Sequence, residues 1–110
     1  MDKVYGLLSI AAKAGRAVSG SETAMEEVKK KRARLVILTE DASQNTRKLF
    51  QDKASYREIP VMIYGNAEDL GLAIGKPPRV VVTVTDEGLS KSILKAAREN
   101  GKQDGENENL

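Results

Sequence analysis

The positions of the apolar residues predict helices and strands that alternate along the chain. Near the start they recur every three or four residues, as on one face of a helix, at Val4, Leu7, Leu8, Ala11 and Ala12. Asp2 is suited to cap this helix and Gly15 to end it. Residues 16–19 then leave room only for a short strand.

The second helix is predicted to begin at a capping box, with Ser19 as the N-cap and Glu22 three residues later. The amides of residues 20–22 then face outward. Residues 35–38 are four aliphatics in succession and predict a strand covered on both faces. Asp41, together with Ser43 or Gln44, is expected to start the next helix. A helix start and the C-terminal end of a strand therefore lie side by side, where open α/β sheets bind ligands.

The second half of the chain continues the same alternation. A helix is expected over residues 43–54, with an inner face of Thr46, Leu49 and Phe50. A strand follows over residues 59–64, and its Pro60 suits a first residue or a sheet edge.

The last elements are bounded by turn and capping residues. Asn66 caps a short helix that Gly75 ends, and two successive prolines keep residues 76–79 extended and rigid. Residues 80–84 predict a central strand. Thr85 or Asp86 then caps a final helix whose inward positions are Leu89, Ile93, Leu94 and Ala97.

The element order αβαβαβαβα, with strands covered on both faces, predicts a three-layer α/β/α sandwich. A chain of 110 residues with 40% hydrophobic content suffices for one domain, assigned to residues 1–99. Residues 100–110 contain a single apolar side chain and are expected to form a disordered polar tail.

The composition argues against catalysis. The chain has neither Cys nor His, which removes thiolate chemistry, the commonest general base and the commonest metal ligand. Glu40 and Asp41 are adjacent carboxylates that can hold Mg²⁺, but no third ligand is identifiable and a capping role suffices. We therefore expect no catalytic residue, no metal and no cofactor.

The sequence also predicts a cytoplasmic location without membrane contact. Residues 4–12 are apolar enough to be mistaken for the core of a signal peptide, but Asp2 cancels Lys3 and leaves no positive n-region. No apolar run approaches the length that crosses a bilayer.

The formal charge of +2 conceals an uneven distribution. Residues 13–34 contain three acidic side chains and seven basic ones, namely Lys13, Arg16, Lys29, Lys30, Lys31, Arg32 and Arg34. A clustered basic surface attracts polyanions. The run also has a simpler interpretation, since Glu26 and Glu27 lie one turn before Lys30 and Lys31 and cations suit a helix C-terminus.

Together these features resemble the ribosomal protein L7Ae family of kink-turn RNA binders, and especially its small bacterial members. The resemblance covers residues 2–98. It rests on Gly20 at the start of the second helix, LVILTEDAS at residues 35–43, IPV at 59–61, DLGLAIG at 69–75 and RVVVTV at 79–84.

The resemblance implies a mixed four-stranded sheet and structured-RNA binding by the first turn of the second helix and two loops. Gly20 matches the family's glycine, Ser21 the small residue after it, Glu22 the Asn that reads guanine edges, and Thr23 the Glu beside it. Glu26 stands where a Lys contacts RNA. Asp41 and Ser43 lie in the loop that meets a flipped-out base, and Lys76, Pro77, Pro78 and Arg79 match the second loop.

The resulting hypothesis is a non-catalytic, monomeric protein that binds ribosomal or another structured RNA, with the ribosome as a further candidate partner. Phosphate contacts are assigned to Lys13, Arg16, Lys29, Lys30 and Arg34. One alternative is a protein–protein interaction adaptor on the same fold, which Glu22 and Glu26 favour. A third is a relative of the substrate-recognition domain of RNA ribose methyltransferases that presents RNA to an enzyme.

Overall fold

A computed structural model describes the backbone of residues 2–109 and the side chains of residues 2–100. In this part of the chain five helices alternate with four strands in the predicted order. The elements are α1 Lys3–Lys13, β1 Ala17–Ser19, α2 Ser21–Lys29, β2 Leu35–Leu38, α3 Gln44–Tyr56, β3 Val61–Ile63, α4 Ala67–Ala73, β4 Val81–Val84 and α5 Glu87–Asn109. None of the described helices is both long and apolar enough to cross a membrane.

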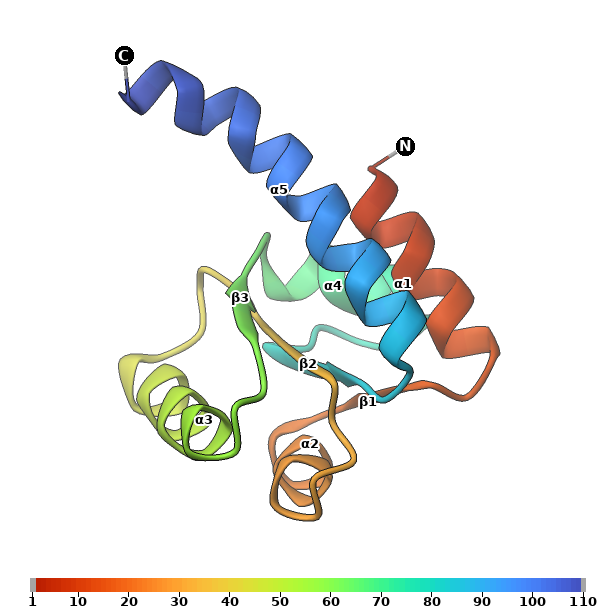
Figure 1. Cartoon of the computed structure of the whole chain (residues 1–110). Coiled ribbons are helices and arrows are strands. Elements are labelled where there is room, and N and C mark those ends of the chain that lie inside the picture. Colours follow the sequence, from red (N-terminus) through yellow and green to blue (C-terminus); the bar gives the residue numbers. More distant parts are fainter. Residues whose placement is uncertain (1, 110) are drawn as a thin grey trace.

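The four strands form one mixed sheet in the order β1-β4-β2-β3. Strand β4 runs antiparallel to both of its neighbours, while β2 and β3 are parallel. Helices α1, α4 and α5 cover one face of the sheet, and α2 and α3 cover the other (Figure 1). The predicted three-layer sandwich, the mixed sheet and the central position of the last strand are confirmed.

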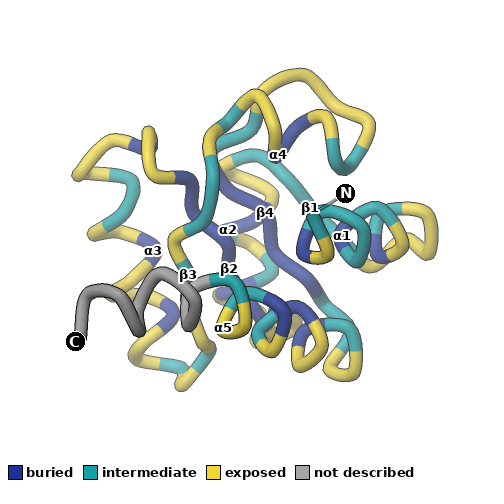
Figure 2. The backbone as a smooth tube through the Cα atoms, turned by 90° about the horizontal axis from the view of Figure 1, so that it is seen from above, coloured by how far each residue is buried: buried dark blue, intermediate teal, exposed yellow. Residues whose placement is uncertain are grey.

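Strand β2 separates two hydrophobic cores because successive side chains of a strand point to opposite faces. Leu35 and Ile37 pack with α1, α4 and α5, whereas Val36 and Leu38 pack with α2 and α3. All four residues are fully buried. Figure 2 shows the buried stretches gathered along the sheet and the inner faces of the helices.

Two details of the sequence prediction are wrong. Ser19 belongs to β1, and the N-cap of α2 is Gly20, which provides no side-chain hydrogen bond. The inner face of α3 is formed by Phe50 and Ala54, while Leu49 is 49% exposed. In both places the packing of neighbouring elements decided between residues that the local pattern allowed.

Helix α5 continues through most of the segment that the sequence predicts to be disordered, residues 100–110. The side chains from residue 101 onward and the whole of residue 110 lie outside the described residues. The division of the chain at residue 99 stays a prediction.

Candidate nucleic-acid interface

The register of the sheet brings three connections to one edge. Ser19 at the end of β1 pairs with Val82, and Leu38 at the end of β2 pairs with Val81, so both strands end where β4 begins. We call this the tip edge and define it as residues 20–23, 39–43 and 76–79. Two of these segments adjoin helix starts, and the third leads into β4.

The first turn of α2 presents free hydrogen-bond donors at the tip edge. The Gly20 amide donates to the Val81 carbonyl at 3.2 Å, and the Gly20 carbonyl accepts from Ala24 at 2.9 Å. Within the described residues, the amides of Ser21, Glu22 and Thr23 have no acceptor. Such amides at the positive end of a helix dipole favour an incoming acceptor or anion.

Gly20 has a backbone conformation that only glycine adopts without strain, with φ 94° and ψ 145°. This geometry lets its amide complete the sheet while the chain turns directly into α2. A side chain at this position would be strained even though only the Thr23 hydroxyl lies within 4 Å of an added Cβ. Substitution of Gly20 would therefore change the stability of the fold as well as the interface.

The segment 76–79 is held against this helix start. The Arg79 amide donates to the Ala67 carbonyl at 3.0 Å, and its Nε donates to the Ser19 hydroxyl at 3.1 Å. The guanidinium is thus fixed one residue from Gly20. Ser19 lies in β1, one residue before the N-cap Gly20, and its hydroxyl accepts from Arg79 and not from an amide of α2.

The third segment, residues 39–43, is braced by its own side chains. The Asp41 carboxylate accepts from the Ala67 amide at 3.1 and 3.3 Å, and Ser43 caps α3 by accepting from Thr46 at 3.1 Å. The Thr39 hydroxyl beside Asp41, and then the Ala67 amide, hold the pKa of Asp41 below its ordinary value. Because that hydroxyl reaches no full hydrogen-bond geometry, the Ala67 bond fixes the carboxylate.

Sequence reasoning missed one cation at the tip edge. The Arg47 guanidinium donates to the Glu40 carbonyl from the first turn of α3. Its position follows from Ser43 being the N-cap, which puts residue 47 one turn into the helix. The tip edge and its border thus carry three cations, Arg47, Lys76 and Arg79, and three carboxylates, Glu22, Glu40 and Asp41.

The basic residues predicted to contact phosphates do not lie at this edge. The Arg34 amide donates to Val84 and the Thr85 amide donates to Arg16, so both arginines flank the opposite edge of the sheet. Lys13 ends α1. Lys29 ends α2 outside the tip edge, although it lines a groove together with Ser21 and Glu22. The two edges are separated by the length of the central strands, roughly 13 Å for four residues. Lys30 faces Glu26 at 4.0 Å.

The basic run also contains a structural ion pair. Arg32 forms two hydrogen bonds with the Glu27 carboxylate, at 2.7 and 3.0 Å. The Arg32 bond is the main reason that the pKa of Glu27 is lowered. The pair fastens the end of α2 to the chain that follows it. Of the two pairs that the simpler interpretation predicts, Glu26 with Lys30 is present, whereas Glu27 pairs with Arg32 in place of Lys31.

A groove lies beside the tip edge, between α2 and α3. Its cavity volume is about 560 Å³, and it is lined by Ser21, Glu22, Met25, Glu26, Lys29 and Leu49. The half-exposed Leu49 and the partly buried Met25 give it an apolar floor. We call it the α2–α3 groove.

The fold is that of a small α/β/α module, and its tip edge brings a helix start and two neighbouring loops together. Among such modules, the chain belongs to the ribosomal protein L7Ae/L30e/S12e/Gadd45 family, whose model matches residues 2–94.

Three relatives illustrate the match. The chain is 42% identical to the RNA-binding protein YlxQ of Bacillus subtilis (strain 168), over 82% of this chain and 90% of that protein. It is 34% identical to the RNA-binding protein YlxQ of Enterococcus faecium, over 81% of this chain and 85% of that protein. A solved structure of a Bacillus halodurans protein of unknown function superimposes with a TM-score of 0.85 and 38% identity. The superposition covers 87% of this chain and 97% of that chain.

Proposed function

We propose that this protein binds a structured RNA of the kink-turn type through the tip edge, without catalysing a reaction. The observation that carries the proposal is the first turn of α2, where three outward amides stand beside the guanidinium of Arg79. Membership of a ribosomal protein family and two relatives named RNA-binding proteins support it. A ribosomal RNA as the partner, a monomeric state and a cytoplasmic location remain predictions from the sequence.

The charges at the tip edge make base recognition more important there than phosphate neutralisation. The amides and the Arg79 guanidinium can donate to acceptors on base edges or to phosphate oxygens, but among the described residues the tip edge and Arg47 beside it supply three cations against three carboxylates. Each neutralised phosphate contributes about −0.9 to the slope of log affinity against log salt. We therefore expect a slope of about −2 to −3 for the tip edge, measured by titration between low and physiological salt.

Ser21→Asp is the sharpest test of the tip edge. A carboxylate in the first turn of a helix is favourable by about 0.3–1 kcal/mol, so the variant should melt no lower than the wild type. The same carboxylate would repel RNA and occupy the free amides. We expect about tenfold or greater loss of affinity for a kink-turn hairpin, measured by fluorescence anisotropy.

Ser92→Asp is the matched control, because Ser92 is an exposed serine on α5, outside the tip edge. It should bind the hairpin as the wild type does. Equal affinities for the wild type and Ser21→Asp would show that RNA does not bind at the start of α2. Glu22→Gln, which exchanges an acceptor-only carboxylate for an amide that also donates, should bind more tightly than the wild type.

The α2–α3 groove favours a second candidate function, the protein–protein interaction adaptor. Met25 and Leu49 offer an apolar contact between the carboxylates of Glu22 and Glu26, which suits a basic amphipathic segment. Purification of the tagged protein from cells, with and without ribonuclease, separates the two functions. Loss of the co-purifying molecules after ribonuclease supports RNA binding, and their retention supports the adaptor.

A further inference from the structure

Helices α1 to α4 all end in the same hydrogen-bonded turn, but two of them lack the usual glycine. After α1, Gly15 has φ 72° and the next amide, of Arg16, donates back to Ala11 at 2.8 Å. The Gly15 amide itself donates to Ala12 at 3.1 Å, and the equivalent two bonds close α2, α3 and α4. Glycine is preferred at this position because φ is positive. Lys31 after α2 has φ 60° and Glu58 after α3 has φ 58°.

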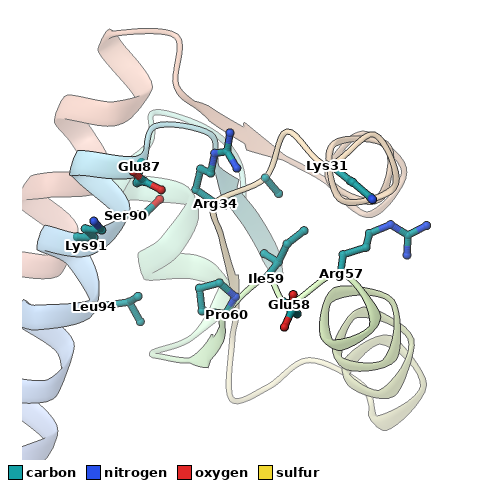
Figure 3. Close-up of a pocket in the computed structure, with 11 residues that line it drawn as sticks. Lys31, Arg34, Arg57, Glu58, Ile59, Pro60, Glu87, Ser90, Lys91 and Leu94 are labelled. Carbon is teal, nitrogen blue, oxygen red and sulfur yellow. The ribbon is translucent and has the colours of Figure 1, made fainter.

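Lys31 and Glu58 are the two non-glycine residues with positive φ in the described chain, and both line one pocket. Its cavity volume is about 390 Å³, within the range of small-ligand sites, about 300–1,000 Å³. Figure 3 shows it between the start of α5 and the segment that leads into β3. We call it the basic-edge pocket, since it lies at the edge that carries Arg34.

The pocket carries more cations than anions. Lys31, Arg34, Arg57 and Lys91 line it together with the carboxylates of Glu58 and Glu87. Within the described residues none of these six side chains forms an ion pair within 4.0 Å. The Arg57 guanidinium donates to the Lys53 carbonyl at 3.0 Å and lies over the Tyr56 ring, which leaves Lys31, Arg34 and Lys91 for an anionic ligand.

A buried polar atom supplies an independent sign of a ligand site. Ser90 lines the pocket from α5 and is 2% exposed, yet its hydroxyl has no hydrogen-bond partner among the described residues. Buried hydroxyls are normally paired because an unpaired one costs about 1–3 kcal/mol. Figure 3 shows Ser90 and Glu87 next to one another on the α5 wall, close to Arg34.

We propose that the basic-edge pocket binds one phosphate-bearing nucleotide, either free or as part of an RNA strand. Arg34 and its neighbouring cations would hold the phosphate. The Glu87 carboxylate would accept from the sugar hydroxyls, and the Ser90 hydroxyl would accept from them or donate to them. Ile59, Pro60 and Leu94 give an apolar wall for the base. The site is separate from the tip edge and does not depend on RNA binding there.

The lining favours a nucleotide over an acidic peptide. Glu58 and Glu87 would repel any anion, but they can accept hydrogen bonds from ribose hydroxyls and base amino groups, whereas the ionised side chains of an acidic peptide offer them no donor. The nucleotide site also gives a reason for the strained backbone at Lys31 and Glu58, which both line the pocket. A glycine would be easier to accommodate at residues 31 and 58, but only a side chain can reach into the pocket.

The test is a titration of the ¹⁵N-labelled full chain, followed by the amide signals of Ser90 and Lys91. ADP and a 5′-phosphorylated hexauridylate are the probes, and hexaglutamate is the acidic-peptide control. We expect saturable shifts at these amides with at least one of the two nucleotide probes. Tighter binding of ADP identifies a free nucleotide as the source, and tighter binding of the hexauridylate identifies an RNA strand.

Two variants distinguish a binding role from a structural one. Lys31→Gly relieves the backbone and Ser90→Ala removes the unpaired hydroxyl, so neither should lower the melting temperature. Both should weaken nucleotide binding several-fold, and Arg34→Glu should weaken it about tenfold or more.

Lys53→Glu, at an exposed site on α3 outside the pocket, and Ser21→Asp at the tip edge should bind the probes as the wild type does. The proposal is overturned if neither nucleotide probe gives saturable shifts, if hexaglutamate binds equally well, or if Lys53→Glu weakens binding as much as Arg34→Glu. Because Ser21→Asp is tested on the hairpin and Arg34→Glu on ADP, the two sites can fail separately.

Discussion

At the scale of single residues, the residues that follow α1, α2 and α3 share one backbone conformation but differ in side chain. Gly15, Lys31 and Glu58 follow helices in the same way and have φ between 58° and 72°. Gly15 has no atom within 4 Å of an added Cβ, so only its backbone conformation resists substitution. Lys31 and Glu58 keep side chains at a cost that glycine would avoid.

A reciprocal pair of substitutions tests this cost. Glu58→Gly should raise the free energy of unfolding by about 1 kcal/mol, because a non-glycine residue in the left-handed region is strained. Gly15→Ala should lower it by a similar amount. Chemical denaturation measures both, and a destabilised Glu58→Gly would mean that its side chain contributes contacts that outweigh the strain.

At the scale of secondary-structure elements, the tip edge depends on how closely α4 approaches the segment 76–79. A Cβ added at Gly71 would lie 2.3 Å from the Pro77 carbonyl oxygen and 2.8 Å from that of Lys76. Both are backbone atoms that cannot move without shifting the segment. Gly71 therefore sets the position of Arg79 beside α2, and its carbonyl also accepts from the Lys76 amide at 2.9 Å.

Gly71→Ala should lower the free energy of unfolding by about 1–3 kcal/mol, as overpacking does, and weaken RNA binding at the tip edge. Gly88→Ala is the matched control. Gly88 lies in α5, and an added Cβ there would make an ordinary 3.4 Å contact with Asp86. Thermal melting and hairpin binding are measured for both variants. If Gly71→Ala binds the hairpin with wild-type affinity, the segment 76–79 does not contribute to the RNA interface.

At the scale of the whole molecule, Tyr64 joins the two ends of the described chain. Its hydroxyl donates to the Asp2 carboxylate at the start of α1 and accepts from the Asn100 amide of α5 at 2.8 Å. Its ring meets Tyr5 edge-on at a centroid distance of 5.6 Å. Burial, followed by the hydrogen bond to Asp2, raises the pKa of Tyr64 from 10.0 to about 12.

This shift predicts a loss of stability at high pH. In the unfolded chain the phenol ionises near pH 10, so the preference of the fold for the protonated form stabilises it fully below that pH. The contribution is lost as the pH rises from about 10 through about 12. Tyr64→Phe should be less stable near neutral pH and lose less stability over that interval, as measured by denaturation at each pH. Parallel pH profiles would exclude Tyr64 as the titrating group.

Much of the fold could be predicted because local patterns encode it. Asp2, Ser43 and Asn66 cap helices as expected, and residues 35–38 and 81–84 form the two central strands. Two exceptions came from competition between neighbours. Ser19 is bound by Arg79, sixty residues away in the chain, and Leu49 stays half-exposed because Phe50 and Ala54 fill the space beneath α3.

The sequence by itself determined the order of the helices and strands, since these depend on periodicity, capping and backbone freedom over a few residues. Only the tertiary structure decided which charged residues share a surface. The strand register placed Arg79 beside Gly20 and moved Arg16 and Arg34 to the opposite edge. Proximity along the chain could not reveal this, because a strand carries its two ends to opposite sides of the molecule.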